Sequence, residues 1–274
     1  MLRIKRNKQI IYFFLATILV LFTMFPYYWM VTQSFAPAKL VDHTFFNTRP
    51  SLEHFTYLMN NGGDQNRFMW LKALFNSIYV TMIVSILAVT FSMLVGYSIS
   101  KLKYKGHKAV FNFLLFQMFF PGIILLIPQF LIMKSFANTY FAMIVPTSMN
   151  LWGIFMIINY FKTVPEAIFE AARIDGASEL KILFKIGLPA ARTIGIIVFL
   201  TVFMGRWTEL MWDMLISPKV QMQTLNVMIT TVFKPMGNLP GPLYAASVFL
   251  TFPTVLLCVL FSKYFREGLS FQLK

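Results

Sequence analysis

Long apolar stretches separated by short polar connections dominate the chain. Six of them approach or exceed the roughly 20 residues that a helix needs to cross the hydrocarbon core of a bilayer. They lie at residues 10–32, 75–100, 110–133, 140–161, 193–216 and 244–262. The runs are continuous rather than alternating, and backbone groups within lipid must be satisfied inside the segment. The pattern therefore predicts an all-α membrane protein with six transmembrane helices.

Prolines interrupt several of these runs. Pro121 and Pro128 lie in the third, Pro146 in the fourth and Pro253 in the sixth. Proline removes a backbone donor and kinks a helix, so it is tolerated where neighbouring helices or a water-filled cavity supply partners. We therefore expect a packed, irregular bundle. The two halves of the sequence show no evident internal repeat, which argues against a transporter built from inverted repeats.

Composition agrees with a membrane protein, because 58% of the residues are apolar and only 12% are charged. The net charge of +14 does not indicate nucleic-acid binding, since the basic residues form short clusters between apolar runs. The single cysteine, Cys258, excludes an internal disulfide and a cysteine-rich metal site. His43, His54 and His107 lie in predicted loops without ligand spacing, so we expect no metal.

The positions of Lys and Arg predict the orientation. Sixteen of them lie before the first run, at 101–108, at 162–192 and after 262, whereas seven lie in the other connections. The positive-inside rule therefore places both termini in the cytoplasm. We expect the first run to remain as a span rather than a cleaved signal, because it continues past Pro26 and its nearest small-residue site precedes Pro37.

The connection 162–192 predicts two short helices that project into the cytoplasm. Thr163 and Glu166 have the spacing of a capping box, and Glu170 follows near the helix N-terminus, where negative charge is favoured. Gly176 is placed to end this first helix by turning the chain. Ser178 can cap a second helix over 179–186, which Gly187 and Pro189 are expected to break.

One segment of this connection carries a specific resemblance. Residues 170–177 read Glu-Ala-Ala-Arg-Ile-Asp-Gly-Ala and are followed by Phe184, Ile186, Leu188 and Pro189. This resembles the EAA loop of ABC importer permeases, in the form found in the carbohydrate-uptake family that includes maltose-type importers. In that family the loop is a coupling helix that docks into the ATPase subunit. The alternative is an ordinary amphipathic connector. The residues matched to coupling are Glu166, Glu170, Ala171, Ala172, Asp175, Gly176, Ala177 and Pro189.

The resemblance extends over nearly the whole chain, including Phe25-Pro26, Phe120-Pro121 and the segment 206–212. It implies a single permease domain over 1–274 with the type I importer fold, in a prokaryotic cell membrane. It also implies a second homologous permease, two ATPase subunits that use ATP and Mg²⁺, an external solute-binding protein and a sugar substrate. Thr208 stands where the family has Asn, and Thr193 where a second proline is common.

Charges within the fifth run are candidates for the substrate pathway, because intramembrane charges usually face a bundle interior or a cavity. On one continuous helix, Arg206, Glu209 and Asp213 share a face. The alternative is an Arg206–Glu209 ion pair that only fixes packing. Some hydrogen-bonding and aromatic side chains suit a sugar, or else merely pack or line the membrane interface: Trp207, Trp212, Asn150, Trp152 and Gln117.

Two other classes compete with an importer subunit. A membrane-embedded glycosyl or acyl transferase would need an acid, base or metal motif, and the aspartates form no Asp-x-Asp pair. An autonomous secondary transporter leaves the extended loop pattern unexplained. The phosphate-binding pattern Gly-x-x-x-x-Gly-Lys-Ser/Thr does not occur, so ATP hydrolysis must come from another chain. Together with the resemblance, this implies a non-catalytic subunit that carries an oligosaccharide, either neutral or uronate-containing.

Overall fold

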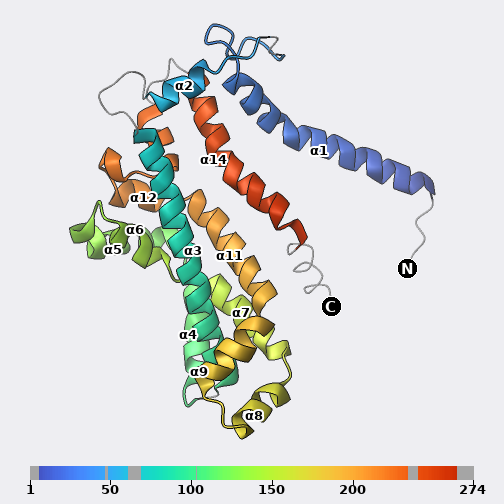
Figure 1. The fold of residues 1–274 in the computed structure, drawn as a ribbon, viewed down its shortest axis with the longest axis vertical. Coiled ribbons are helices and arrows are strands. Elements are labelled where there is room, and N and C mark those ends of the chain that lie inside the picture. The colour runs from blue at the N-terminus through green and yellow to red at the C-terminus, as the bar shows by residue number, and fades with distance from the viewer. Residues whose placement is uncertain (1–5, 47–48, 61–68, 103, 234–239, 264–274) are drawn as a thin grey trace. The chain divides into compact units, whose positions relative to one another are not determined.

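The regular elements of the chain are helices throughout the part that the structure describes (Figure 1). This computed structural model describes residues 6–46, 49–60, 69–102, 104–233 and 240–263. The chain divides into two compact units. The first comprises residues 1–70 and 229–253, and the second comprises residues 71–228 and 254–274.

The first unit joins the N-terminal helix to the beginning of the last one. It contains α1 (Arg6–Ser34), α2 (Glu53–Met59), η6 (Ile229–Phe233) and the first two thirds of α14 (Pro240–Leu260). Trp29 Nε1 donates to the Tyr244 hydroxyl at 3.4 Å, and that hydroxyl donates to Asp42 Oδ1 at 2.7 Å. Gly241 packs directly on the His54 ring, where any Cβ would collide. These contacts lie at the ends of the two long helices.

The second unit is the larger one. Its core centres on α3 (Met69–Lys101), from Leu71 onward, and on buried residues such as Val84, Tyr97 and Phe161. The other elements are α4 (His107–Met118), α5 (Gly122–Met133), η2 (Lys134–Phe136), α6 (Tyr140–Ile144), η3 (Val145–Thr147), α7 (Leu151–Thr163), α8 (Glu166–Ile174), α9 (Glu179–Ile182), η4 (Leu183–Gly187), α10 (Leu188–Ala190), α11 (Arg192–Trp207), α12 (Met211–Ile216), η5 (Val220–Met222) and α13 (Leu225–Met228).

Glycines set the close packing of the three central helices. A Cβ on Gly96 of α3 would lie 2.5 Å from Ile157 of α7, and one on Gly153 of α7 would lie 2.7 Å from Val198 of α11. A Cβ on Gly195 of α11 would lie 2.5 Å from Met93 of α3. Small residues at crossings are the usual way for membrane helices to approach closely, because dispersion contacts drive their association. These three helices therefore pack closely against one another within the second unit.

Six spans are present if each bent pair of helices counts as one. Four helical stretches are long and apolar enough to cross a membrane: 8–34, 69–101, 140–163 and 240–260. The third predicted run is not one helix, because α4 and the segment 122–136 meet at an angle of 103° around Pro121. Glu179–Ala190 and α11 form a second bent pair at 76°. Within the second unit, the irregularity that the prolines predicted is confirmed at Pro121, whereas Pro128 lies inside α5.

Candidate functional site

The connection between α7 and α11 folds into a helical hairpin, with α8 as its first arm. The predicted capping box is wrong, because Thr163 belongs to the last turn of α7 and donates to the Tyr160 carbonyl at 2.7 Å. Pro165 occupies the N-cap of α8 and makes no side-chain cap bond. Glu166 therefore does not cap α8. Its Oε2 instead accepts from the Lys101 Nζ at 3.1 Å.

The turn between the two arms agrees with the sequence. Gly176 has φ +76°, the left-handed conformation that favours glycine at the end of a helix. The amide of Gly176 donates to the Arg173 carbonyl, and that of Ala177 donates to the Ala172 carbonyl, each at 3.0 Å. Ser178 caps α9 by accepting from the Lys181 amide at 3.4 Å. The predicted glycine stop and serine cap are confirmed.

The second arm differs from its prediction, because Gly187 and Pro189 do not break the helix. Helical conformation continues from α9 through the π-turn η4 into α10. The Leu188 amide donates to the Leu183 carbonyl across the wider π-turn, so Pro189 enters the next turn where its missing N–H is tolerated. The bend follows at Ala191, before α11.

Charged side chains tie the hairpin to the end of α3. Lys101 Nζ donates to the Val164 carbonyl at 2.9 Å as well as to Glu166. Arg173 Nε donates to Glu179 Oε1 at 2.7 Å, and its Nη2 donates to the Lys101 carbonyl at 3.1 Å. The Tyr97 hydroxyl donates to the other Glu179 oxygen at 2.7 Å. The bond from Arg173 lowers the pKa of the Glu179 carboxyl, so this pair is ionised at neutral pH.

An aromatic cluster lies beneath these charges. Phe169 of α8 is fully buried and lies within 6.0 Å of the Tyr97 ring and 6.4 Å of the Phe161 ring, centroid to centroid. The Lys101 ammonium sits 4.6 Å above the Phe169 ring, within the range of a cation–π contact. The hairpin is therefore attached to α3 by apolar burial and by ion pairs together.

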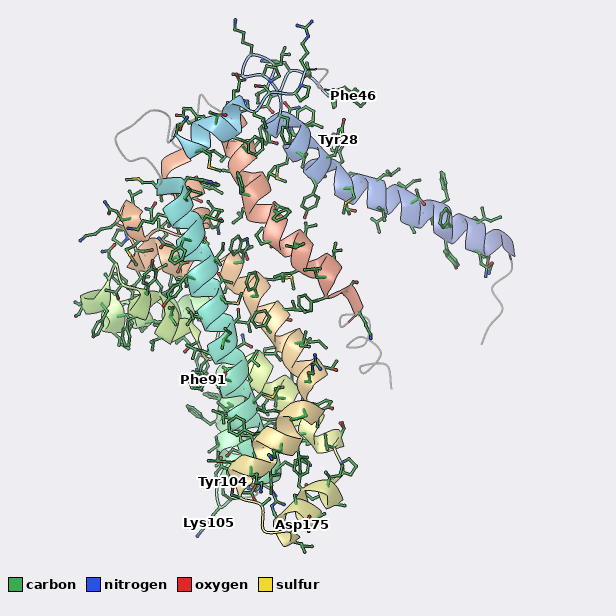
Figure 2. All side chains as sticks on the ribbon, viewed as in Figure 1. Tyr28, Phe46, Phe91, Tyr104, Lys105 and Asp175 are labelled. Atoms are coloured by element: carbon green, nitrogen blue, oxygen red, sulfur yellow. The ribbon has the colours of Figure 1, made fainter. Side chains whose placement is uncertain are left out.

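The opposite side of the hairpin is exposed and partly apolar. Ile174 is 86% exposed, Leu180 65% and Phe184 59%. Figure 2 shows Asp175 at the same end of the second unit as Tyr104 and Lys105, which lie in the connection from α3 to α4. Of the predicted coupling residues, the exposed ones are Glu170, Ala171, Asp175, Gly176 and Pro189, and the half-buried ones are Glu166, Ala172 and Ala177.

The predicted charged face of the fifth span does not lie on one helix. Helix α11 ends at Trp207 and α12 begins at Met211, so the assumption of a continuous helix through Asp213 is wrong. Two polar side chains hydrogen-bond to backbone groups at this break. Asn226 Nδ2 donates to the Thr208 carbonyl at 2.7 Å, and Glu209 Oε1 accepts from the Trp212 amide at 3.1 Å.

The break brings Arg206 and Asp213 together as a buried pair. Arg206 Nη1 and Nη2 donate to the two Asp213 oxygens at 2.8 and 2.6 Å, and the side chains are 4% and 1% exposed. Nη2 also lies 3.4 Å from the Met143 carbonyl of α6. The Arg206–Glu209 pair considered from the sequence is therefore replaced by an Arg206–Asp213 pair.

The other residues proposed for the pathway make no hydrogen bond or ring contact with this pair among the contacts of the described residues. Trp207 is buried and stacks on Phe203, with ring centroids 5.9 Å apart. Asn150 caps α7 by accepting from the Gly153 amide at 2.6 Å, and Trp152 is 37% exposed in the same helix. Gln117 is exposed on α4.

Sequence reasoning missed several polar contacts that hold the second unit together. Asn76, near the start of α3, donates to the carbonyls of Gln221 and Gln223 and accepts from the Tyr140 hydroxyl at 2.6 Å. Trp212 Nε1 donates to the Ala142 carbonyl at 3.1 Å. An amide within a predicted span was the available signal, because polar residues in membranes face partners.

The histidines need one correction. His54 lies in α2 and is buried, and His107 opens α4, so neither is a loop residue. Within the described ranges, no three His, Cys, Asp or Glu side chains gather as a metal site would require.

Residues 88–266 match the family described as binding-protein-dependent transport system inner membrane component. The chain belongs to this family. It is therefore a multi-pass membrane protein and a permease subunit of ABC importers, a transport component rather than a catalyst. The alternatives of a membrane transferase and an autonomous secondary transporter are not favoured.

Relatives and a solved structure agree with this family. The chain is 30% identical to the arabinooligosaccharides transport system permease protein AraQ of Halalkalibacterium halodurans, over 80% of this chain and 78% of that protein. It is 30% identical to the trehalose/maltose transport system permease protein MalG of Thermococcus litoralis, over 96% and 95%. A crystal structure of a bacterial ABC transporter involved in alginate import matches with a TM-score of 0.83 at 22% identity, over 97% of this chain and 100% of that chain. The fold is thus that of an ABC importer permease.

Proposed function

We propose that this chain is the membrane-spanning subunit that couples ATP hydrolysis to the import of an oligosaccharide. It acts with a second homologous permease, two ATPase subunits that bind ATP and Mg²⁺, and an external solute-binding protein. The observation that carries the proposal is the hairpin 163–191, which is anchored to α3 on one side and exposes Ile174, Leu180 and Phe184 on the other.

The exposed side of the hairpin is suited to docking in an ATPase subunit. Three large apolar side chains, Ile174, Leu180 and Phe184, lie within eleven residues of one another and are more than half exposed. If these side chains form one surface, it would be a candidate for a protein interface. Glu170 and Asp175 flank them, so a basic rim on the ATPase cleft would complement the hairpin.

The anchored side provides a route from docking to transport. Movement of the docked hairpin pulls on Lys101 and Tyr97, which belong to α3, through Glu166, Arg173 and Glu179. Helix α3 packs closely on α7 and α11 through Gly96 and Gly195. The hairpin and these three helices would thus move as one body when the ATPase subunits close.

We assign the substrate pathway to the bend between α11 and α12, with Arg206 and Asp213 holding its shape rather than contacting the sugar. Asp213 engages both Arg206 Nη groups and the Arg206 side chain is 4% exposed, so the guanidinium is not open to a substrate carboxylate. Glu209 and the exposed side chains Gln117 and Trp152 remain candidates for sugar contacts. The Glu209 carboxylate without an open cation beside it disfavours a uronate, so we propose a neutral oligosaccharide. The two relatives are named for such sugars, whereas the matched solved structure imports the acidic polysaccharide alginate.

Co-purification with ATPase subunits tests the coupling role. Leu180→Asp should reduce recovery of candidate ATPase subunits of ABC importers from the same organism at least tenfold, while membrane expression of the chain persists. Leu102→Asp is the matched control, because Leu102 is an exposed leucine in the α3–α4 connection. Equal recovery with both variants and the wild type would refute docking by the hairpin. Screening the solute-binding protein against neutral and uronate oligosaccharides tests the substrate class separately.

A further inference from the structure

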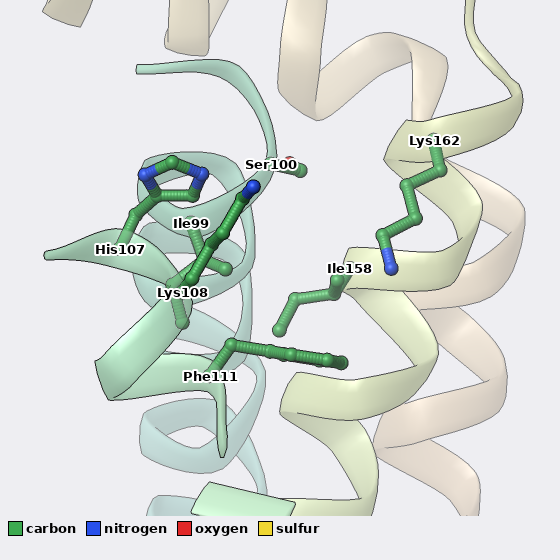
Figure 3. Close-up of a pocket in the computed structure, with 7 residues that line it drawn as sticks. All are labelled: Ile99, Ser100, His107, Lys108, Phe111, Ile158 and Lys162. Atoms are coloured by element: carbon green, nitrogen blue, oxygen red, sulfur yellow. The ribbon is translucent and has the colours of Figure 1, made fainter. Parts of the chain in front are cut away.

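A pocket separate from the coupling hairpin lies where three membrane helices end. It has a volume of about 360 Å³ and is lined by Ile99, Ser100, His107, Lys108, Phe111, Ile158 and Lys162 (Figure 3). Ile99 and Ser100 come from the last turn of α3, His107 opens α4, and Lys162 lies in the last turn of α7. The pocket is therefore at the depth of the lipid headgroups.

The polar side of this pocket is basic. Lys108 on α4 and Lys162 on α7 approach from opposite sides, both exposed, and the lining includes no Asp or Glu (Figure 3). Among the described residues, ion pairs are formed by Lys101, Arg173 and Arg206, whereas none is found for Lys108 or Lys162. The Lys162 ammonium lies 4.8 Å from the centre of the Phe111 ring, which holds it over the pocket. His107 Nδ1 is engaged by the Tyr104 carbonyl at 2.7 Å, so its other ring nitrogen remains available.

The opposite side of the pocket is apolar and faces toward the membrane core. Ile99 and Ile158 are buried in a small cluster with Ile154, and Phe111 packs against it. A basic rim above an apolar wall matches an amphipathic ligand whose head is anionic. In addition, no side chain caps the N-terminus of α4, and its first turn contains no acid, which favours a negative charge there.

We propose that this pocket binds the phosphate of an anionic phospholipid, with Lys108 and Lys162 pairing with the phosphate and the glycerol and first acyl carbons lying on Phe111 and Ile158. Basic pockets between membrane helices are a general form of lipid headgroup recognition. The positive-inside orientation places this lipid in the cytoplasmic leaflet. The pocket is lined by neither the exposed tip of the hairpin nor the Arg206–Asp213 pair. The lipid proposal can therefore be tested independently of the coupling role.

Native mass spectrometry of the full chain, purified in detergent and titrated with dioleoylphosphatidylglycerol, tests the proposal. Each lysine near an anionic headgroup contributes about fivefold in affinity, so Lys108→Gln with Lys162→Gln should weaken lipid binding about 25-fold. Lys108→Arg with Lys162→Arg keeps the charge and should bind within about threefold of the wild type. Lys105→Gln with Lys185→Gln removes the same charge from exposed positions outside the pocket and should have little effect.

Three results would overturn the proposal. Equal weakening by the Lys105/Lys185 variant would mean that the lipid responds only to general surface charge. Unchanged binding by the Lys108/Lys162 variant would place the lipid elsewhere. Complete displacement of the lipid by 10 mM inorganic phosphate would identify a site for free phosphate rather than for a phospholipid.

Discussion

At the scale of single residues, the main finding concerns the two charges at the bend of the fifth span. Arg206 and Asp213 form a bidentate pair with almost no exposure, and the Met143 carbonyl provides a further acceptor. A buried ion pair contributes little net stability compared with apolar residues, but loss of one partner leaves a buried charge. The pair therefore fixes the geometry of the bend.

This pairing predicts that removing one partner lowers the stability more than removing both. Arg206→Met should destabilise the protein by about 3–5 kcal/mol, because Asp213 is left buried without its cation. Arg206→Met with Asp213→Leu should recover most of that loss. Thermal unfolding of the purified chain in detergent measures both. Glu209→Gln is the control and should change little, so a rescue of Arg206→Met by Glu209→Gln instead of Asp213→Leu would refute the assigned pairing.

Gly176 provides a second prediction at this scale. Its φ of +76° costs about 1–2 kcal/mol for a residue with a Cβ, although no neighbouring atom obstructs a side chain. Gly176→Val should therefore reshape the hairpin turn and reduce transport-linked ATPase activity of the assembled importer, whereas Gly176→Asn should be milder because Asn tolerates this conformation. Equal activity of Gly176→Val and the wild type would show that the turn is not needed. Gly205→Ala, at an open position with ordinary helical φ, is the matched control.

At the scale of elements, the sequence predicted where helices exist better than where they end. Apolar runs and prolines located the spans and the irregular third one, and Gly176 and Ser178 marked the hairpin turn. The continuation through Pro189 was missed because a π-turn that absorbs a proline has no signal in apolar periodicity. The break after Trp207 was missed for a similar reason, since Thr208 and Glu209 stabilise it through Asn226 and Trp212, which only the fold brings near.

The contacts between the hairpin and α3 predict how a change at Lys101 affects coupling. Lys101→Met removes the bonds to Val164 and Glu166 but keeps much of the apolar stem that packs near Phe169. We expect ATPase subunits still to bind, because the exposed tip is intact, while sugar-stimulated ATPase activity falls severalfold. Lys105→Met, an exposed lysine in the next connection, is the control. Loss of ATPase binding together with activity would indicate that Lys101 supports folding of the hairpin rather than coupling.

At the scale of the whole molecule, α3 fixes which connections share a side of the membrane. Lys101 at its end contacts the hairpin, and Asn76 near its start holds the carbonyls of Gln221 and Gln223. These positions are 25 residues apart on one helix, or about 38 Å, which exceeds the roughly 30 Å of a hydrocarbon core. The hairpin and the segment 219–223 must therefore emerge on opposite sides.

The positive-inside rule then assigns the sides, and cysteine labelling measures them. With Cys258 replaced by Ser, a cysteine at Lys105 should react with an impermeant maleimide only after the membrane is opened, since sixteen of the Lys and Arg residues lie on its side. A cysteine at Lys219, exposed beside η5, should react in intact cells. Gly62 should also react from outside, although it lies beyond the described residues. Labelling of Lys105 and Lys219 from the same side would contradict the span of α3. If the two cysteines label from the opposite sides to those expected, α3 still spans the membrane but its orientation is reversed. The hairpin would then face away from the cytoplasmic ATPase subunits, and the coupling role would be refuted.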